Sequence, residues 1–272
     1  MYDFNIELPE EVLTPGKHKE INFNAMRGKT IIGLMGYAKS GKDFITKTFI
    51  EDYGYHRVAF ADNIKKEMNE YLKDLVFLDI QKTSTGYVPI ELKDIDFFTE
   101  NLELKKILRP YIIWYGEKLR NINGIFCWIN KAFEEDAAGY DKIILSDVRR
   151  MAELDIFKDS NEFNKRRRLN LAEAGILSSE SNSVKDYGTL LFEVSQLGLQ
   201  DSDILTLDTI RHAHENWIID DIFYVDPRIP DIKTARQVIM SSQIKRIAKK
   251  FGIEKPEKIS GKQTNIFQHP GV

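Results

Sequence analysis

The stretch TIIGLMGYAKSGKD, residues 30–43, decides the fold. Its first six residues form an apolar run, which predicts a buried strand. The next eight residues fit the pattern G-x-x-x-x-G-K and end in aspartate, and residues 43–52 show apolar side chains at helical spacing. A strand, a glycine-rich loop and a helix in this order are typical of a phosphate-binding loop, whose backbone N–H groups and helix N-terminus surround phosphate oxygens. Lys42 would reach the β- and γ-phosphates and Ser40 would add a donor; the alternative is a chance glycine-lysine turn.

Two carboxylates are candidate magnesium ligands. Asp43 stands where the loop pattern usually has Ser or Thr, and it could bind Mg²⁺ directly or through water. The alternative is a helix-start residue favoured by the helix dipole. Asp147 follows the apolar residues 143–145, as a Walker-B aspartate follows its strand. Arg149 and Arg150 come next and could bind phosphate oxygens, unless this segment is only a turn with a solvated basic pair.

Composition excludes several classes of protein. The chain has 272 residues, of which 42% are hydrophobic and 30% charged, as expected for one or two folded domains. Cys127 is the single cysteine, which excludes an intrachain disulfide framework and a multi-cysteine metal site. The net charge of −3 argues against nucleic-acid binding, although the basic residues 165–168 and 245–250 leave that alternative open. Because the sequence shows neither a secretory pattern nor a long apolar run, we expect a soluble cytoplasmic protein with no membrane partner.

The rest of the chain alternates between candidate strands and helices. Further strands are predicted at residues 58–61, 143–147, 190–194 and 221–225, and helices at 64–78, 104–119 (with a break near Pro110), 126–135 and 234–251. Residues 79–100 are predicted to be irregular, because Thr83-Ser84-Thr85-Gly86 and Pro89 interrupt them. This alternation predicts an α/β fold with a mostly parallel sheet.

Four segments together resemble one family of kinases. Residues 36–44 resemble the K-x-S-G-K-D loop shared by bacteriophage deoxynucleoside monophosphate kinases and animal phosphomevalonate kinases, in which aspartate characteristically follows the loop lysine. Residues 59–65 resemble the family's F-A-D/G-P-L/I-K segment, with Asn63 in place of proline. The others are 112–128, which resembles G-x-x-x-R…W through Gly116, Arg120, Phe126 and Trp128, and 145–153, which resembles D-x-R-x-x-x-E. His214-Glu215 resembles a late turn of the family more weakly, and the likeness spans about residues 30–240.

The resemblance implies a P-loop NTPase with the three-layer fold of nucleoside monophosphate kinases. Such an enzyme transfers the γ-phosphoryl group of ATP·Mg²⁺ to a small-molecule phosphate acceptor, here a (deoxy)nucleoside monophosphate, and gives the diphosphate. Four kinds of site residue are then expected: for ATP, Gly36, Lys39, Ser40, Gly41, Lys42, Asp43 and Phe44; for Mg²⁺, Asp43 and Asp147; for the acceptor, Asp62, Lys65, Arg109, Arg120 and Trp128; and for catalysis, Lys42, Asp147, Arg149 and Arg150.

The same likeness suggests a domain organisation and leaves questions open. We expect an N-terminal arm at 1–28, a kinase domain at 29–251 with an insertion at 159–188, and a C-terminal tail at 252–272. Such kinases supply lid arginines after the fourth strand, yet only Arg211 lies between Ser195 and His214, unless Arg166, Arg167 and Arg168 substitute from the insertion. The open alternatives are a kinase for a non-nucleotide, phosphomevalonate-like acceptor and a nucleotide-binding module without turnover. A homodimer, and a host-cytoplasm location for a phage-encoded chain, also stay open.

Overall fold

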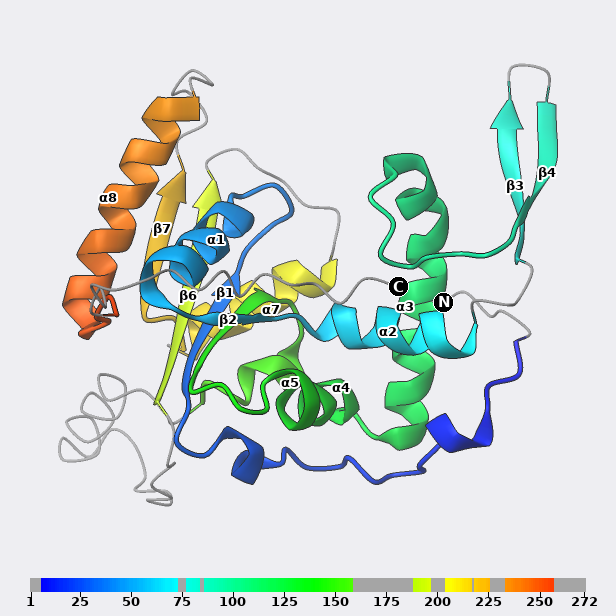
Figure 1. Ribbon diagram of the computed structural model, residues 1–272, viewed down its shortest axis with the longest axis horizontal. Helices are drawn as coiled ribbons and strands as arrows, with labels where there is room; N and C mark the ends of the chain where they lie inside the picture. Colours follow the sequence, from blue (N-terminus) through cyan, green and yellow to red (C-terminus); the bar gives the residue numbers. More distant parts are fainter. Residues whose placement is uncertain are drawn as a thin grey trace, which may run out of the picture.

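A parallel five-stranded sheet forms the centre of the protein (Figure 1). The computed structural model describes residues 6–72, 77–83, 86–158, 188–196, 204–216, 218–225 and 233–256. The strand order is β2 (His56–Val58), β5 (Lys142–Val148), β1 (Thr30–Met35), β6 (Gly188–Gln196) and β7 (Asp221–Val225). The predicted α/β class and the mostly parallel sheet are therefore confirmed.

The middle strand β1 is apolar throughout because both faces of the sheet are covered. Its residues 31–35 are buried, and Ile32 pairs with Ile144 on one side and with Leu190 on the other. Ile31 packs into the core on one face, whereas Ile32 packs into the core on the opposite face. The carboxyl ends of all five strands meet at one edge, which is where ligands bind in open parallel sheets.

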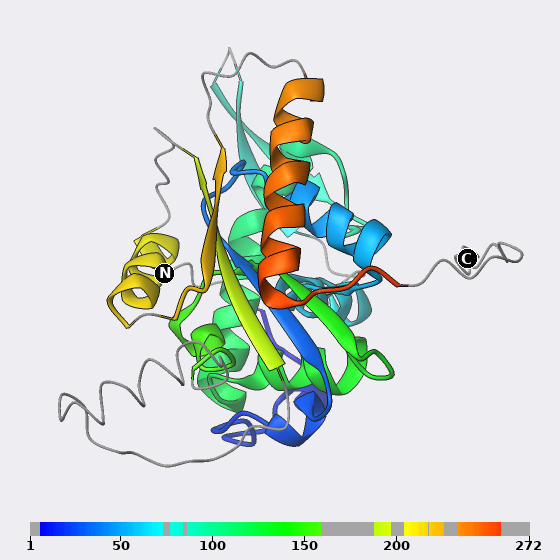
Figure 2. The ribbon, with the colours of Figure 1, turned by 90° about the vertical axis from the view of Figure 1, so that its left-hand side faces the viewer.

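Helices cover both faces and produce three layers (Figure 2). On one face, α1 (Lys42–Tyr53) and α8 (Lys233–Phe251) supply buried residues such as Phe49 and Ile244. Among the described residues, the helices that cover the other face are α2 (Phe60–Tyr71), α3 (Leu102–Asn123), α4 (Cys127–Lys131), α5 (Met151–Leu154) and α7 (Ile204–Glu215). In the part of the chain described, no helix is long and apolar enough to cross a bilayer.

An antiparallel hairpin projects beside the helical layer, and the sequence analysis missed it. Strands β3 (Phe77–Thr83) and β4 (Gly86–Leu92) pair from Phe77↔Leu92 to Thr83↔Gly86, so the prediction of irregular structure across 79–100 is wrong for these residues. Pro89 was taken as a strand breaker. A two-stranded sheet consists only of edge strands, however, and an edge strand accommodates a proline whose missing N–H faces away from the partner.

Other elements also differ from the predictions, and the helix predicted at 64–78 ends at Tyr71. Helix α3 continues through Pro110, because Asn101 caps its N-terminus and the buried Leu108 and Tyr111 hold it on either side of the proline. The strand predicted at 58–61 ends at Val58, and α2 begins two residues later. Helix α7 was not predicted at all.

The N-terminal arm is fastened to the helical layer by two buried amides. Asn123 donates to the carbonyl of Val12 at 2.7 Å and accepts from the N–H of Thr14 at 2.8 Å. Asn130 accepts from the N–H of Asn22 at 2.8 Å. Two short 3₁₀ helices, η1 (Glu10–Val12) and η2 (Phe23–Met26), lie within the arm, and a third short segment, η3 (Ala132–Asp136), extends α4 as a π-helix. The predicted insertion, apart from Gly188, and residues 257–272 of the predicted tail lie outside the described residues.

Candidate functional site

The loop between β1 and α1 has the backbone of a tight cradle. Gly36, Lys39 and Gly41 have φ angles of 139°, 65° and 102°, a region that favours glycine. A Cβ atom on Gly36 would lie 2.4 Å from the carbonyl oxygen of Val194 on β6 and 3.2 Å from the Ser40 hydroxyl oxygen. The glycine at this position is therefore required both by its backbone angle and by the close approach of the loop to β6.

Two polar side chains are buried within this cradle. Ser40 is 1% exposed, and its hydroxyl oxygen has no hydrogen-bond partner among the described residues. Lys42 is 7% exposed, and its ammonium group donates to the carbonyls of Gly36 at 2.6 Å and Tyr37 at 2.7 Å. A buried hydroxyl without a partner is costly unless a ligand oxygen contacts it, so the cradle fits a bound phosphate group.

The end of β5 brings a carboxylate to the same place. One oxygen of Asp147 lies 3.7 Å from the Lys42 ammonium, and the other lies 2.5 Å from Nε of Arg149. Asp43 is exposed in the first turn of α1. No group of three or more potential ligand residues that could hold a metal occurs within the described ranges. One or two carboxylates fit Mg²⁺ only when phosphate oxygens and water complete its coordination, as in nucleotide sites.

A second charged cluster lies next to these residues. Glu117 of α3 accepts a hydrogen bond from Arg120 at 2.8 Å and forms an ion pair with Arg150 at 2.6 Å. Glu153 is buried and accepts the backbone N–H groups of Arg149 and Arg150 at 2.7 and 3.0 Å. Burial raises the pKa of Glu153 and lowers the pKa of the Arg120 guanidinium, the latter also because Arg150 is near. Glu117 was not among the predicted site residues, and its i, i+3 spacing to Arg120 was the available signal.

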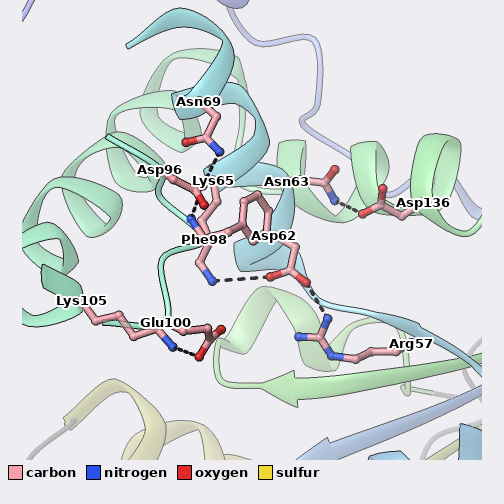
Figure 3. Close-up of polar contacts among 10 residues, drawn as sticks. All are labelled: Arg57, Asp62, Asn63, Lys65, Asn69, Asp96, Phe98, Glu100, Lys105 and Asp136. Carbon is pink, nitrogen blue, oxygen red and sulfur yellow. Dashed lines mark hydrogen bonds and ion pairs between the residues drawn. The ribbon is translucent and has the colours of Figure 1, made fainter. Parts of the chain in front are cut away.

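The predicted acceptor residues on α2 pair with each other. Asp62 lies between Arg57, at 2.6 Å, and Lys65, at 3.7 Å (Figure 3). The Lys65 ammonium also lies 5.1 Å from the centre of the Phe98 ring. Nearby, Asn69 donates to Asp96, so this network joins α2 to the segment that follows the hairpin. Asp62, Arg57 and Lys65 are the charged side chains of this network that a ligand could compete for.

Two predicted acceptor residues are not in these clusters. Arg109 is exposed on α3, eleven residues before Arg120, a separation of about 16 Å along a helix. Trp128 is 2% exposed, and its ring N–H donates to the carbonyl of Gly116 at 3.1 Å. The structure thus places the Trp128 ring in the core. Of the remaining loop residues, Lys39 is exposed and Phe44 packs against the core beneath α1 and α8.

Helix α7 completes the edge beside the loop. His214 contacts the buried carboxylate of Glu193 at 2.6 Å, and Glu193 pairs in register with Met35, the last residue before Gly36. Thr209 donates to the carbonyl of Arg149 at 2.7 Å. Arg211, the one arginine expected for a lid after β6, is exposed and lies 3.8 Å from Asp208 on the same helix. Glu193 was not predicted, since a single acidic residue in an apolar strand gives no pattern.

Comparison with known proteins assigns no family to the chain. No protein-family model matches the chain, and no curated protein matches it. The case for a function therefore rests on the cradle, on the carboxylate and arginines beside it, and on the parallel sheet that brings them together.

Proposed function

We propose that the protein is a P-loop kinase that transfers the γ-phosphoryl group of ATP·Mg²⁺ to a (deoxy)nucleoside monophosphate and releases the diphosphate. One observation carries the proposal: the buried Ser40 hydroxyl and Lys42 ammonium lie in a positive-φ loop beside Asp147. The strand order supports it. From β1 the chain moves toward β2 on one side of the sheet, whereas β6 and β7 lie on the other side, so the loop sits where the strand order reverses. Ligands bind at such switch points.

Each group at the edge would have a defined role. The loop N–H groups, the Ser40 hydroxyl and Lys42 would bind the β- and γ-phosphates, with Lys42 turning from its two carbonyl partners toward phosphate oxygens. Asp43 and Asp147 would hold Mg²⁺, which when bound neutralises charge on the phosphates. Arg149 and Arg150 would stabilise charge on the transferring group. This chemistry needs positioning and charge neutralisation, both of which the site offers.

The acceptor would bind beside the helices α2 and α3. Arg120, Arg150 and Lys65 supply positive charge between α2, α3 and the end of β5, which suits an anionic acceptor. The phosphate group of an acceptor bound there would face the loop, with the Asp147–Arg149 pair between them.

A second candidate, a kinase for a non-nucleotide phosphate, is favoured by one observation. Trp114 and Trp128, whose rings would be available to stack on a base only if they were exposed, are 5% and 2% exposed. An acceptor recognised through charge alone, such as a phosphomevalonate-like molecule, needs no stacking platform. The identity of the acceptor thus separates the two candidates.

A transfer assay tests the proposal. ATP labelled in its γ-phosphoryl group is incubated with each nucleoside monophosphate and with phosphomevalonate, using wild type, Lys42→Ala and the control Lys47→Ala. Lys47 is an exposed lysine of the same helix, paired with Glu51. We expect a labelled diphosphate with wild type and Lys47→Ala but not with Lys42→Ala. ATP binding without transfer to any acceptor would reject the kinase and leave a nucleotide-binding module.

A further inference from the structure

Glu117 occupies the position between two arginines that an anionic ligand would be expected to take. The same carboxylate oxygen, Oε1, accepts a hydrogen bond from Nη1 of Arg120 at 2.8 Å and lies 2.6 Å from Nη2 of Arg150 in an ion pair. Arg120 belongs to the last turns of α3, whereas Arg150 follows β5 and precedes α5. Two arginines from separate elements converging on one oxygen form a fork that matches phosphate as well as carboxylate.

The fork is partly buried and rigidly supported. The side chains of Arg120, Glu117 and Arg150 are 12%, 22% and 26% exposed, so the contacts are sheltered but reachable from solvent. Gly116, one residue before Glu117, lets α3 approach Ile64 of α2 so closely that a Cβ would lie 2.9 Å from its Cδ1 atom. Glu153 fixes the backbone of Arg150 through its N–H group. The backbone on both sides of the fork is therefore held in place.

Charge determines which ligand could replace Glu117. The two arginines carry two positive charges, and Glu117 cancels one of them. A singly charged anion offers the arginines no more than Glu117 does, while it loses translational freedom on binding. A phosphate monoester carries up to two negative charges and three terminal oxygens, so it gains more from the same fork.

We propose that Arg120 and Arg150 form the subsite for the acceptor's phosphate group, as a dianionic monoester, and that Glu117 is a built-in competitor which the phosphate must displace. This inference rests on the proposed kinase function but concerns a separate part of the site. It predicts that Glu117 lowers acceptor affinity, and that removing its charge raises that affinity while leaving ATP binding unchanged.

The test measures binding of inorganic phosphate at pH 8 by calorimetry in a Lys42→Ala background, which removes the loop lysine's contribution. Adding Glu117→Gln should tighten phosphate binding by about tenfold, the order expected for one charge interaction at a partly exposed site. The matched control, Glu103→Gln, removes the same charge from an exposed residue of the same helix and should change nothing. Adding Arg150→Gln to the same background should weaken phosphate binding at least tenfold, and methanesulfonate, a singly charged ion, should bind more weakly than phosphate to every variant.

Unchanged or weaker phosphate binding by Glu117→Gln would overturn the proposal, because Glu117 would then be a support for the arginines and not a competitor. If this variant does not fold, as judged by its melting curve, Glu117→Asp replaces it; the shorter side chain cannot reach both arginines and should also tighten binding. The two hypotheses fail separately. Tighter phosphate binding by Glu117→Gln without any transfer activity would reject the kinase function and keep the subsite. Transfer activity with no effect of Glu117→Gln on phosphate affinity or acceptor KM would keep the kinase function and reject the subsite.

Discussion

Replacing Gly36 with alanine should destabilise the protein by about 2–5 kcal/mol, and the structure separates this cost into two parts. The φ angle of 139° is disfavoured for any residue with a Cβ, which costs about 1–2 kcal/mol. The new methyl group would also lie 2.4 Å from the Val194 carbonyl oxygen, so the loop or the end of β6 must move. Overpacking of this kind costs about 1–3 kcal/mol.

Gly139→Ala is the matched control. Gly139 has a φ angle of 79°, and a Cβ placed on it would meet nothing within 4 Å. This variant therefore experiences only the backbone cost. The difference between the two variants measures the close approach of the loop to β6.

Thermal and urea unfolding provide the assay. A loss of 1 kcal/mol corresponds to about 2–4 °C in a chain of this size, so Gly36→Ala should melt about 4–20 °C below wild type and clearly below Gly139→Ala. It should also bind ATP more weakly, because the cradle is distorted. Equal melting temperatures for the two glycine variants would refute the packing of the loop against β6.

Three other perturbations give separate tests. Burial raises the pKa of Asp220 to about 7 from 3.8, so between these values the folded protein keeps a proton that the unfolded chain has lost, and stability falls as pH rises. Asp220→Asn retains an oxygen for the Leu191 N–H and should melt higher than wild type at pH 8 but equally at pH 4. Asn123→Ala should cost about 2 kcal/mol and expose the N-terminal arm to proteolysis, whereas the exposed Asn24→Ala should do neither. Asp147→Asn should lower kcat for transfer by about 10- to 100-fold and raise the Mg²⁺ concentration required, as measured by turnover at varied Mg²⁺.

Local patterns predicted the elements around the loop well. An apolar run bounded by glycine identified β1 because a parallel strand buried on both faces is apolar along its length, and the same reasoning identified β5. The short apolar run at residues 222–225 also identified the edge strand β7. Asp147 and Arg149 could be placed beside the loop because they lie at and just beyond the carboxyl end of the core strand β5.

Tertiary context explains most of what was missed. The hairpin contains a proline and several turn-forming residues, and its strands pair only with each other, so no periodic apolar face marked them. Pro110 breaks isolated helices, but packing of α3 on α2 overrides that tendency. Trp128 matched a motif position, yet its neighbours in space place it in the core. Glu117 and Glu193 depend on partners 33 and 21 residues away, at Arg150 and His214, which no local pattern reveals.

Calorimetric titration with ATP·Mg²⁺ tests the central claim most directly, because it asks whether the loop binds nucleotide before any acceptor is known. Wild type and Lys47→Ala should bind one ATP per chain, and Lys42→Ala should bind roughly 10- to 100-fold more weakly, as expected for the loss of a charge-assisted contact. Equal affinity in all three proteins, or no binding by wild type, would contradict the assignment of residues 36–42 as a phosphate-binding loop.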